Sequence, residues 1–534
     1  MGTTRICVAA VLVMVAPSWC AAWQGDEDDE LRPGLVQRIT VADQTAASIV
    51  SDPIVEPIST PAKTRYVWTG LFLIRGEGTH QFHAHLSGKV TVKLGERVVL
   101  DASANQPVWI SGPDVELTFG EFPLEITADV ENPGDRLKLY WSSTTFPLEP
   151  LPYHALFHAD DAAHGRLVEL GRDIVEAWNC RGCHAVERRQ PGLSGPSLKT
   201  LGAGTDVAWL RERLTRGEPA AHSRMPAFGF AANDADAVLA YLGNEAKPPA
   251  LPDVDVKRSE KEVAAGAQLI KSVGCLACHV WKELGKNPLL GGGPLDDVAR
   301  HRSVPWLVAK LTDPHGVNPA SRMPTFALSH DERRQIAAAL STGDLPKITP
   351  LGKGIKRTEE LVARGRELVR TARCGACHEL PGDVAPFEIA KPQAWSAVGG
   401  ERSCTGRTTD PSRRQPRFAA TFNDAIAAYL AETQSQQIAE RSANFGERLL
   451  MTKGCLNCHD RNGSRGLSAI TKDIVRTEPT WEGQSPTLQP PSLTAVGDRL
   501  PDELLAKGVR GELPRRMDWL KVRMPKFRHS DAEV

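Results

Sequence analysis

The motif C-x-x-C-H occurs four times in this chain of 534 residues and constrains its fold more than any other feature. In the c-type haem attachment signature, the two thiols bind a haem covalently and the histidine binds its iron. A single copy could also be half of a zinc site or a redox-active disulfide. Four copies, each with histidine in fifth place, argue against both alternatives. The motifs predict four covalently bound haem c groups, attached through Cys180, Cys183, Cys275, Cys278, Cys374, Cys377, Cys455 and Cys458, with His184, His279, His378 and His459 as iron ligands.

The first 22 residues have the pattern of a secretory signal peptide. Arg5 precedes an apolar run from Ile6 to Ala16, and the small residues Ala21 and Ala22 stand where a signal peptidase cleaves. The run is too short to span a membrane, and no later run is long enough. We therefore expect a periplasmic or otherwise extracytoplasmic protein with no transmembrane segment after signal removal. The net charge of −1 gives no sign of a nucleic-acid partner.

Residues 23–45 and 46–152 differ in composition. The first segment opens with the acidic run Gly25–Glu30, which predicts a solvated leader. The second alternates apolar and polar residues, as in Val90–Leu94, Phe122–Ile126 and Leu137–Trp141, with glycine and proline between the runs. This period of two predicts an all-β sandwich over residues 46–152.

The predicted sandwich resembles the protective-antigen-like β-sandwich of extracellular carbohydrate-binding and adhesion proteins. The resemblance rests on Trp68–Gly70, Gly76–Phe82, Gly120–Leu124 and Leu137–Trp141. It implies possible docking to a surface or a polysaccharide. Sugar-binding members carry an Asp-Asp pair for calcium where this chain has Leu86–Lys89, so calcium-dependent sugar binding is not expected.

The rest of the chain repeats a longer pattern around each haem motif. A glycine stands nine residues before each first cysteine, and two apolar residues follow it three and four positions later. This spacing predicts an amphipathic helix in which the glycine lets a second helix approach closely. The four glycines are Gly171, Gly266, Gly365 and Gly446.

This pattern resembles class I cytochrome c, in which an N-terminal helix crosses a C-terminal helix at a small residue. The resemblance implies four mainly α modules, at residues 155–248, 257–345, 355–435 and 438–534, each with its own haem. It also implies that a proline carbonyl after each motif accepts the N–H of that motif's histidine. The prolines in this place are Pro196, Pro294, Pro392 and Pro491.

Three of the four modules contain the run R-M-P-x-F, at residues 224–228, 322–326 and 523–527. Only seven methionines occur in the chain, so this repetition favours iron ligation over core packing. We expect Met225, Met323 and Met524 to be the second iron ligands of the first, second and fourth haems. A thioether ligand raises the reduction potential.

The third module departs from this pattern. At residues 414–418 it reads R-Q-P-R-F, with Gln415 in place of methionine. Cys404 is the one cysteine outside the signal peptide and the haem motifs, and a thiolate from it is a second candidate ligand. The favoured alternative is that Cys404 does not bind the iron, which is then five-coordinate or water-bound. In each case the third haem is expected to differ from the other three.

The fourth module lacks room for a complete C-terminal helix. Only seven residues follow Phe527, although Ser530 and Glu533 have the spacing of a capping box. So few residues cannot sustain a helix. We therefore expect the C-terminal helix of this module to be truncated and the module to be the least stable.

The sequence thus predicts a multidomain chain, an N-terminal all-β sandwich followed by four cytochrome c modules. The favoured function is an exported tetrahaem cytochrome that carries electrons between redox protein partners, with the sandwich for docking. The alternative is a haem oxidoreductase whose third haem acts on a small, possibly sulfur-containing substrate. A surface adhesin with attached haems is the least favoured hypothesis, and electron transfer is favoured over substrate conversion.

Overall fold

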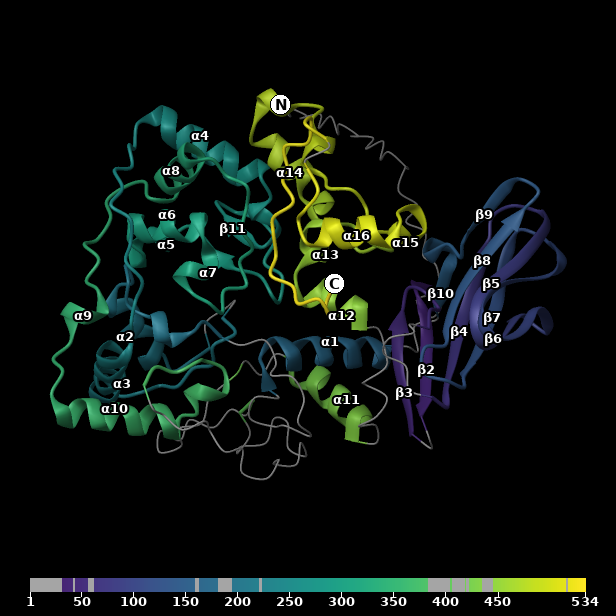
Figure 1. Ribbon diagram of the computed structural model, residues 1–534, viewed down its shortest axis with the longest axis horizontal. Helices are drawn as coiled ribbons and strands as arrows, with labels where there is room; N and C mark the ends of the chain where they lie inside the picture. Colours follow the sequence, from purple (N-terminus) through teal and green to yellow (C-terminus); the bar gives the residue numbers. More distant parts are fainter. Residues whose placement is uncertain are drawn as a thin grey trace, which may run out of the picture.

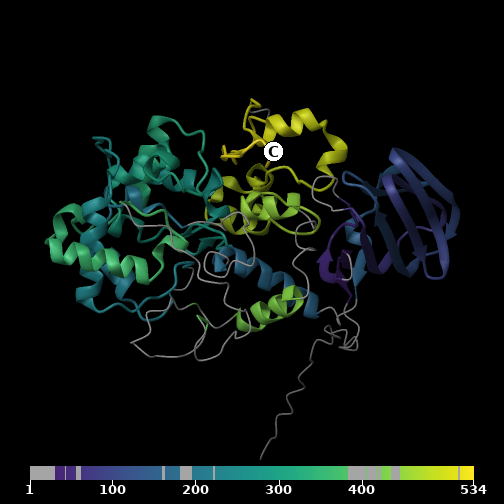
Figure 2. The same ribbon diagram turned by 60° about the horizontal axis from the view of Figure 1, so that its bottom comes forward.

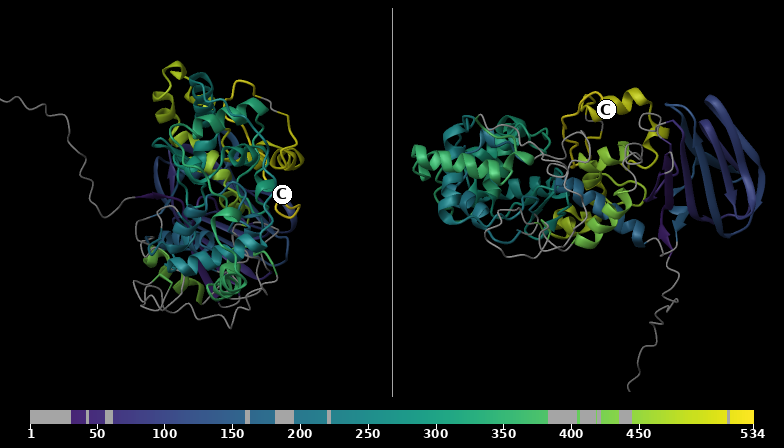
Figure 3. Two further views of the ribbon diagram at one scale, coloured as in Figure 1. Left: turned by 90° about the vertical axis from the view of Figure 1, so that its left-hand side faces the viewer. Right: turned by 90° about the horizontal axis from the view of Figure 1, so that it is seen from below.

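A computed structural model describes residues 31–41, 44–55, 62–158, 163–180, 195–219, 223–382, 404–405, 418, 422–434, 445–514 and 517–534. A β-sheet region lies at one end of the molecule, and a helical part lies beside it (Figure 1). The turned views show the same separation (Figure 2, Figure 3). The predicted signal peptide lies outside the described residues.

The N-terminal region is one curled antiparallel sheet of ten strands. Its main path runs β1-β10-β4-β7-β5-β8-β9, with β2 paired to β3 and β4, and β6 paired to β5. The strands are β1 Arg32–Pro33, β2 Leu35–Val41, β3 Gln44–Val50, β4 Thr64–Ile74, β5 Gly78–Leu94, β6 Arg97–Leu117, β7 Gly120–Val130, β8 Arg136–Ser143, β9 Phe146–Pro150 and β10 Leu156–His158.

The curl comes from β5, which changes neighbours along its length. Residues His80–Ser87 pair with β8, whereas Lys89–Leu94 pair with β7. The change occurs at Gly88, which has a φ of +101°. A Cβ atom there would lie 2.8 Å from the carbonyl oxygen of Asp129. Glycine at this position therefore allows one strand to serve both halves of the sheet.

The predicted all-β character of this region is confirmed, but its boundaries are wrong. The alternating residues Val90, Val92 and Ile126 are fully buried in the sheet core. The leader predicted over residues 23–45 extends too far, because β1, β2 and the start of β3 lie within it. Leu35 and Ile39 of β2 are buried, so this segment contributes to the core. The sheet also continues past residue 152 to β10.

The helical part consists of short helices and a small three-stranded sheet. Serine or threonine caps begin α4, α8 and α10, and α8 has the predicted capping box of Ser329 and Glu332. No described helix has the length and apolar character needed to cross a membrane. The elements are α1 Ala163–Ala177, α2 Val207–Thr215, α3 Ala232–Glu245, α4 Glu260–Ser272, β11 His279–Trp281, β12 Leu284–Gly285, β13 Gly293–Pro294, α5 Val298–His301, α6 Val304–Thr312, α7 Pro314–Val317, α8 His330–Leu340, α9 Leu351–Gly354, α10 Glu359–Thr371, α11 Asn423–Gln434, α12 Phe445–Thr452, α13 Cys455–Cys458, α14 Thr471–Arg476, α15 Val496–Arg499 and α16 Asp502–Val509.

Helix α4, which precedes the second motif, crosses α8 of the same predicted module. A Cβ atom on Gly266 would overlap the carbonyl oxygen of Gln335 in α8. Ile270 of α4 and Ile336 of α8 are both buried at this crossing. The predicted glycine-mediated crossing is therefore confirmed for residues 257–345.

The first and third predicted modules exchange their helices. Helix α1, before the first motif, packs on α11, and helix α10, before the third motif, packs on α3 (Figure 1). A Cβ atom on Gly171 would overlap the carbonyl oxygen of Ala425 in α11. A Cβ atom on Gly365 would likewise overlap the carbonyl oxygen of Ala237 in α3. Each of these two units therefore combines segments from both predicted modules.

The prediction that residues 155–248 and 355–435 form one module apiece is therefore wrong. The first half of each segment packs with the second half of the other. The physical reason is that both second halves offer a helix for the same glycine crossing, so the repeated pattern does not specify which of them a first half packs on. We call the α1–α11 pair the outer unit and the α3–α10 pair the inner unit, after their order along the chain.

Helix α12, which precedes the fourth motif, is less well covered than α1. Leu449 and Leu450 are only partly buried, whereas the equivalent Ile174 and Val175 of α1 are at most 1% exposed. Burial of an apolar side chain contributes about 1.5–3 kcal/mol. The pair in α12 therefore stabilises its helix less than the pair in α1.

Amide hydrogen exchange should consequently be faster over residues 445–452 than over residues 167–175. Amides of a helix with little apolar cover open with a lower free energy. Exchange followed by mass spectrometry on the haem-loaded protein would measure this difference. Equal protection in the two helices would contradict it.

Replacing Gly365 by Ala should destabilise the inner unit by about 1–3 kcal/mol, the usual result of overpacking. The added methyl group would overlap the Ala237 carbonyl oxygen, which outweighs the gain of about 1 kcal/mol expected for Gly→Ala in an open helix. Chemical unfolding would measure the change. Gly497→Ala in α15 is the matched control, because no atom lies within 4 Å of the Cβ position there. Equal stability of the two variants would be inconsistent with the close crossing.

Candidate haem sites

Three of the four motif histidines are described, and all three have the same arrangement. The Nδ1 atom of His279 donates to the carbonyl oxygen of Gly293 at 2.9 Å. His378 and His459 donate through Nδ1 to the carbonyl oxygens of Pro196 and Pro491, both at 2.7 Å. A carbonyl only accepts, so the proton is on Nδ1 and the lone pair of Nε2 is available to a metal. This is the orientation that a haem-binding histidine requires.

Glycines fix the positions of two of these rings. A Cβ atom on Gly292 would overlap Cε1 of His279. A Cβ atom on Gly195 would lie 2.6 Å from Cε1 of His378. Neither ring could keep its place beside a larger residue, so the backbone itself shapes the proximal side of both sites.

The predicted proline contacts hold in part. Pro491 accepts from its own histidine, as expected. In the second site the acceptor is the carbonyl of Gly293 and not that of Pro294. Pro196 accepts from His378 of the third motif, although the prediction paired it with the first motif. Pro392 lies outside the described residues.

The described motif cysteines differ from those of redox or zinc sites. Burial raises the pKa of the Cys275 and Cys374 thiols to about 12. Reactive C-x-x-C pairs and zinc ligands instead have lowered pKa values and act as thiolates. Within the described ranges, no group of three or more His, Cys, Asp or Glu side chains is placed to hold a metal ion.

The arginines of the R-M-P-x-F runs support the fit of a haem. Nη1 of Arg322 is buried and has no hydrogen-bond partner among the described residues, whereas the guanidinium of Arg523 already pairs with Glu332 at 2.6 Å. Burial lowers the pKa of the Arg322 guanidinium to about 10, and it also lowers that of Arg224. A haem carries two carboxylates, which are the acceptors that such buried cations need.

The predicted methionines occupy different environments. Met225 packs among apolar residues of the inner unit, including Leu368 and Cys374. Met524 is 58% exposed, and the run that contains it pairs with the equivalent run of the second module through a bridge between Thr325 and Lys526. The second and fourth modules thus meet at their methionine-containing segments.

Neighbouring motifs contact each other in two pairs. Asn457 of the fourth motif donates to Sγ of Cys278 in the second motif at 3.2 Å. Asn179, just before the first motif, donates to the carbonyl oxygen of Ala376 in the third motif at 3.0 Å. The Leu289–Leu290 segment of the second module packs in the same apolar cluster as Cys180. These contacts link Asn179 to the third motif, the fourth motif to the second, and a segment of the second module to the cluster beside Cys180.

Of the remaining predicted site residues, the structure describes only Cys404. Cys183, His184 and Gln415 lie outside the described residues. Cys404 is described, and its carbonyl oxygen accepts a hydrogen bond from the backbone N–H of Phe418 at 2.8 Å. Phe418 in turn stacks on Trp178, which stands two residues before Cys180, with ring centroids 5.0 Å apart. Cys404 and Phe418 thus lie close to Trp178, at the end of α1.

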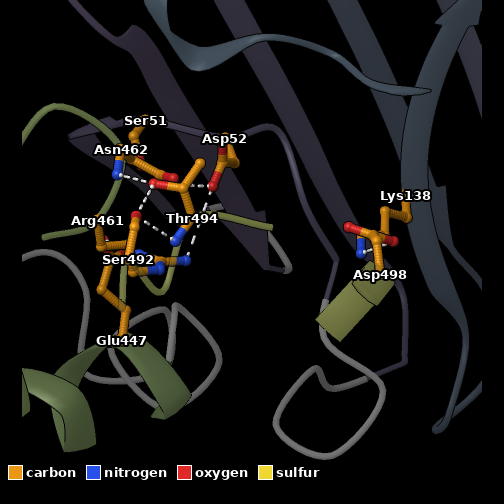
Figure 4. A network of polar contacts seen from close by, with 9 residues as sticks. All are labelled: Ser51, Asp52, Lys138, Glu447, Arg461, Asn462, Ser492, Thr494 and Asp498. Atoms are coloured by element: carbon orange, nitrogen blue, oxygen red, sulfur yellow. Dashed lines mark hydrogen bonds and ion pairs between the residues drawn. The ribbon is translucent and has the colours of Figure 1, made fainter. Parts of the chain in front are cut away.

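A polar junction that the sequence did not predict joins the sheet to the loop after the fourth motif (Figure 4). Asn462 donates to Oγ of Ser51 at 2.9 Å and also to Asp52. Burial raises the pKa of the Asp52 carboxyl, and the Arg461 guanidinium 3.7 Å away offsets part of this rise. No motif marks these residues, because their pairing arises only when distant segments meet.

The second contact of this junction involves α15. Asp498 accepts from Nζ of Lys138 at 2.5 Å and from the hydroxyl of Tyr140 at 2.7 Å. Both donors come from β8, and burial together with Asp498 raises the pKa of the Tyr140 hydroxyl. The sheet is therefore fixed to the fourth module at two separate points (Figure 4).

A comparison with protein families now bears on these sites. Residues 166–242 match the family described as "Cytochrome C oxidase, cbb3-type, subunit III". The chain carries a c-type cytochrome domain. Such a domain implies covalently bound haem c, electron transfer and redox partners for this cytochrome. The matched residues are contiguous in sequence, although the structure divides them between the outer and inner units.

Several solved structures share a limited likeness with the chain. An "anti-sigma factor domain-containing protein" has 22% identity, with a TM-score of 0.23, over 25% of this chain and 50% of that one, so this chain spans about half the length of that protein. The "PA14 sugar-binding domain from RTX adhesin" has 14% identity and a TM-score of 0.21, over 24% of this chain and 98% of that one. The Epithelial Adhesin 9 A domain from Candida glabrata in complex with Galb1-3GlcNAc has 11% identity and a TM-score of 0.20, over 24% and 91%. No curated protein matches the chain.

Replacing Asp498 by Ala should loosen the junction between β8 and α15. The change leaves two partly buried donors without their acceptor, at a cost of about 1–3 kcal/mol. We expect faster amide exchange over residues 136–143, while the haem spectra stay unchanged. Glu503→Ala is the matched control, since it removes an exposed pair with Lys507 in the adjacent α16. Unchanged exchange in Asp498→Ala would show that this contact contributes nothing to the junction.

Proposed function

We propose that this cytochrome is an exported tetrahaem electron carrier, with one haem on each C-x-x-C-H motif. The observation that carries the proposal is that described residues at or next to the four motifs lie close to one another. Asn179 and Asn457 each bridge a pair of motifs, and the Leu289–Leu290 segment connects the two pairs. Haems attached at these positions would be neighbours, which is what transfer from haem to haem requires.

The proposed path does not follow the chain. It runs from the third motif through the first and second to the fourth, so electrons would enter or leave at the third and fourth haems. The inner unit with the third motif lies far from the sheet, whereas the fourth module lies next to it (Figure 1). Redox partners would therefore approach the carrier at opposite ends.

We infer that the N-terminal sheet docks a partner or a surface close to the fourth haem. The support is its polar junction with the loop that follows His459, where Ser51 and Asp52 contact Asn462. The resemblance to protective-antigen-like domains adds polysaccharide as a candidate surface. Attachment at two points would keep the docked surface in a fixed relation to the fourth haem.

The first test is the number of haems per chain, measured by haem absorbance and by intact mass. Four haems are expected, and fewer would contradict the tetrahaem proposal.

Met323→Leu should lower one midpoint potential by roughly tenths of a volt, because axial ligands set haem potentials over a span of about 0.8 V. It should also reduce the thioether-to-iron charge-transfer band by the absorbance that one methionine-ligated haem contributes. An unchanged band would contradict ligation by Met323.

Spectra recorded during the redox titration that measures these midpoint potentials would also distinguish an electron carrier from a haem oxidoreductase. An enzyme with an open iron position should show a high-spin ferric signal that changes when a small sulfur-containing substrate is added. A carrier should show no substrate-dependent change. This comparison needs no assumption about which haem is the unusual one.

A further inference from the structure

We propose that Met225 is the second iron ligand of the haem on Cys374 and Cys377, and that the haem on Cys180 and Cys183 is the one without a methionine. This assignment rests on the proposed haem binding and reverses the assignment expected from chain order. It follows from the way in which the outer and inner units combine their segments.

On the proximal side, the segment after the first motif forms the wall around the third motif. The backbone N–H of Gly195 donates to the carbonyl oxygen of Cys377 at 2.5 Å, and that of Leu198 donates to Glu379 at 2.9 Å. The carbonyl oxygen of Pro196, which follows Gly195, accepts from Nδ1 of His378. Three successive contacts therefore commit residues 195–198 to the third haem and orient its histidine.

Side chains reinforce the same pairing. Lys199 forms an ion pair with Glu379 at 2.7 Å, and Ser197 donates to the same carboxylate at 2.9 Å. The hydroxyl of Tyr241 in α3 donates to the carbonyl oxygen of Pro381 at 2.6 Å. Residues on both sides of Met225 in the sequence thus hold the segment that follows His378.

On the distal side, Met225 packs against the apolar cluster of the inner unit. Leu368 and Val369 of α10 belong to this cluster, and Cys374 of the third motif also packs against it. It also contains Leu239 and Leu242 of α3, the helix that crosses α10 at Gly365. Residues 195–198 lie against the third motif, and α3, which follows Met225 in the sequence, packs on α10 just before that motif. Met225 lies between these two segments in the chain, so we place it at the same haem.

The helix before the first motif packs on a helix that follows the third motif in the chain. Helix α1 crosses α11 at Gly171, and Trp178 stacks on Phe418. Phe418 is the last residue of R-Q-P-R-F, the run that has Gln415 where the others have methionine. The whole stretch from residue 379 to residue 444 contains no methionine. Phe418, the end of a run without methionine, therefore lies beside Trp178, two residues before the first motif.

The assignment changes the expected order of potentials. A thioether ligand raises the potential of its haem. The third haem should then have a methionine-type potential, and the first haem, inside the path, should be the unusual one. In the alternative oxidoreductase, the candidate reaction site would likewise move from the third haem to the first.

Zero-length cross-linking tests the pairing without any substitution. Carbodiimide treatment of the haem-loaded protein should join Lys199 to Glu379, since the two groups are in contact and about half exposed. Peptide mass spectrometry of the monomer would detect this bond, and the Lys138–Asp498 contact serves as the positive control. If Lys199 is instead joined to Glu187, just after the first motif, the first module is contiguous and the proposal is wrong.

Ligand substitution tests the iron assignment itself. Met225→Leu should reduce the absorbance of the thioether band by one haem's contribution, both in the full protein and in a variant whose Cys180 and Cys183 are replaced by Ser. In a variant with Cys374 and Cys377 replaced by Ser, which cannot attach the third haem, Met225→Leu should not change this absorbance. Met323→Leu is the control and should reduce the band by one haem's contribution in both cysteine variants. The opposite dependence for Met225 would overturn the assignment.

The outcomes separate this proposal from the proposed function. Fewer than four haems would contradict the tetrahaem function, while the Lys199–Glu379 cross-link would still report on the exchanged segments. Four haems together with a Lys199–Glu187 cross-link would leave the carrier intact and reject the exchange. If a cysteine-replaced background fails to fold, resolved redox titration of Met225→Leu in the full protein remains decisive. The lowered potential must then belong to the haem whose spectrum also responds to Gly195→Ala, because a Cβ atom there would lie 2.6 Å from Cε1 of His378.

Discussion

Backbone contact at a glycine is the interaction on which the helical part depends. At Gly171, Gly266 and Gly365, a second helix places a carbonyl oxygen where any side chain would lie. This crossing fixes the end of the first helix, from which the C-x-x-C-H motif continues. Because this contact joins backbone atoms at a residue without a Cβ, it depends little on the side chains of the second helix. It therefore does not select which second helix packs against the first. The exchange between the outer and inner units is a consequence of this lack of specificity.

The exchange sets the order of the haem sites. A carrier built from four contiguous modules would place its motifs in chain order. Here the inner unit is assembled within the outer one, and the second module lies between the two halves of the inner unit along the chain. The contacts of Asn179 and Asn457 then bring the first motif to the third and the second motif to the fourth. Chain order and the proposed electron path therefore differ.

The sheet joins this assembly through charges that are partly buried. Asp52 and Arg461 approach each other where burial makes an unpaired charge costly, and Asp498 satisfies two donors from β8. Polar junctions of this kind are typical between domains of one chain. This one lies beside the loop that follows His459, so movement of the sheet would act directly on the surroundings of the fourth haem site.

The sequence by itself determined the local chemistry. Four C-x-x-C-H motifs predict haem attachment, and the glycine before each motif and the alternation of Val90 and Val92 predict helix crossings and strands, because each pattern depends on residues close together in the chain. Only the tertiary structure decided which halves meet, that Pro196 serves His378, and that Ser51 and Asp52 contact Asn462. Repeated segments have equivalent surfaces, so nothing local distinguishes one partner from another. That choice is made by contacts between residues such as Lys199 and Glu379, which are 180 positions apart.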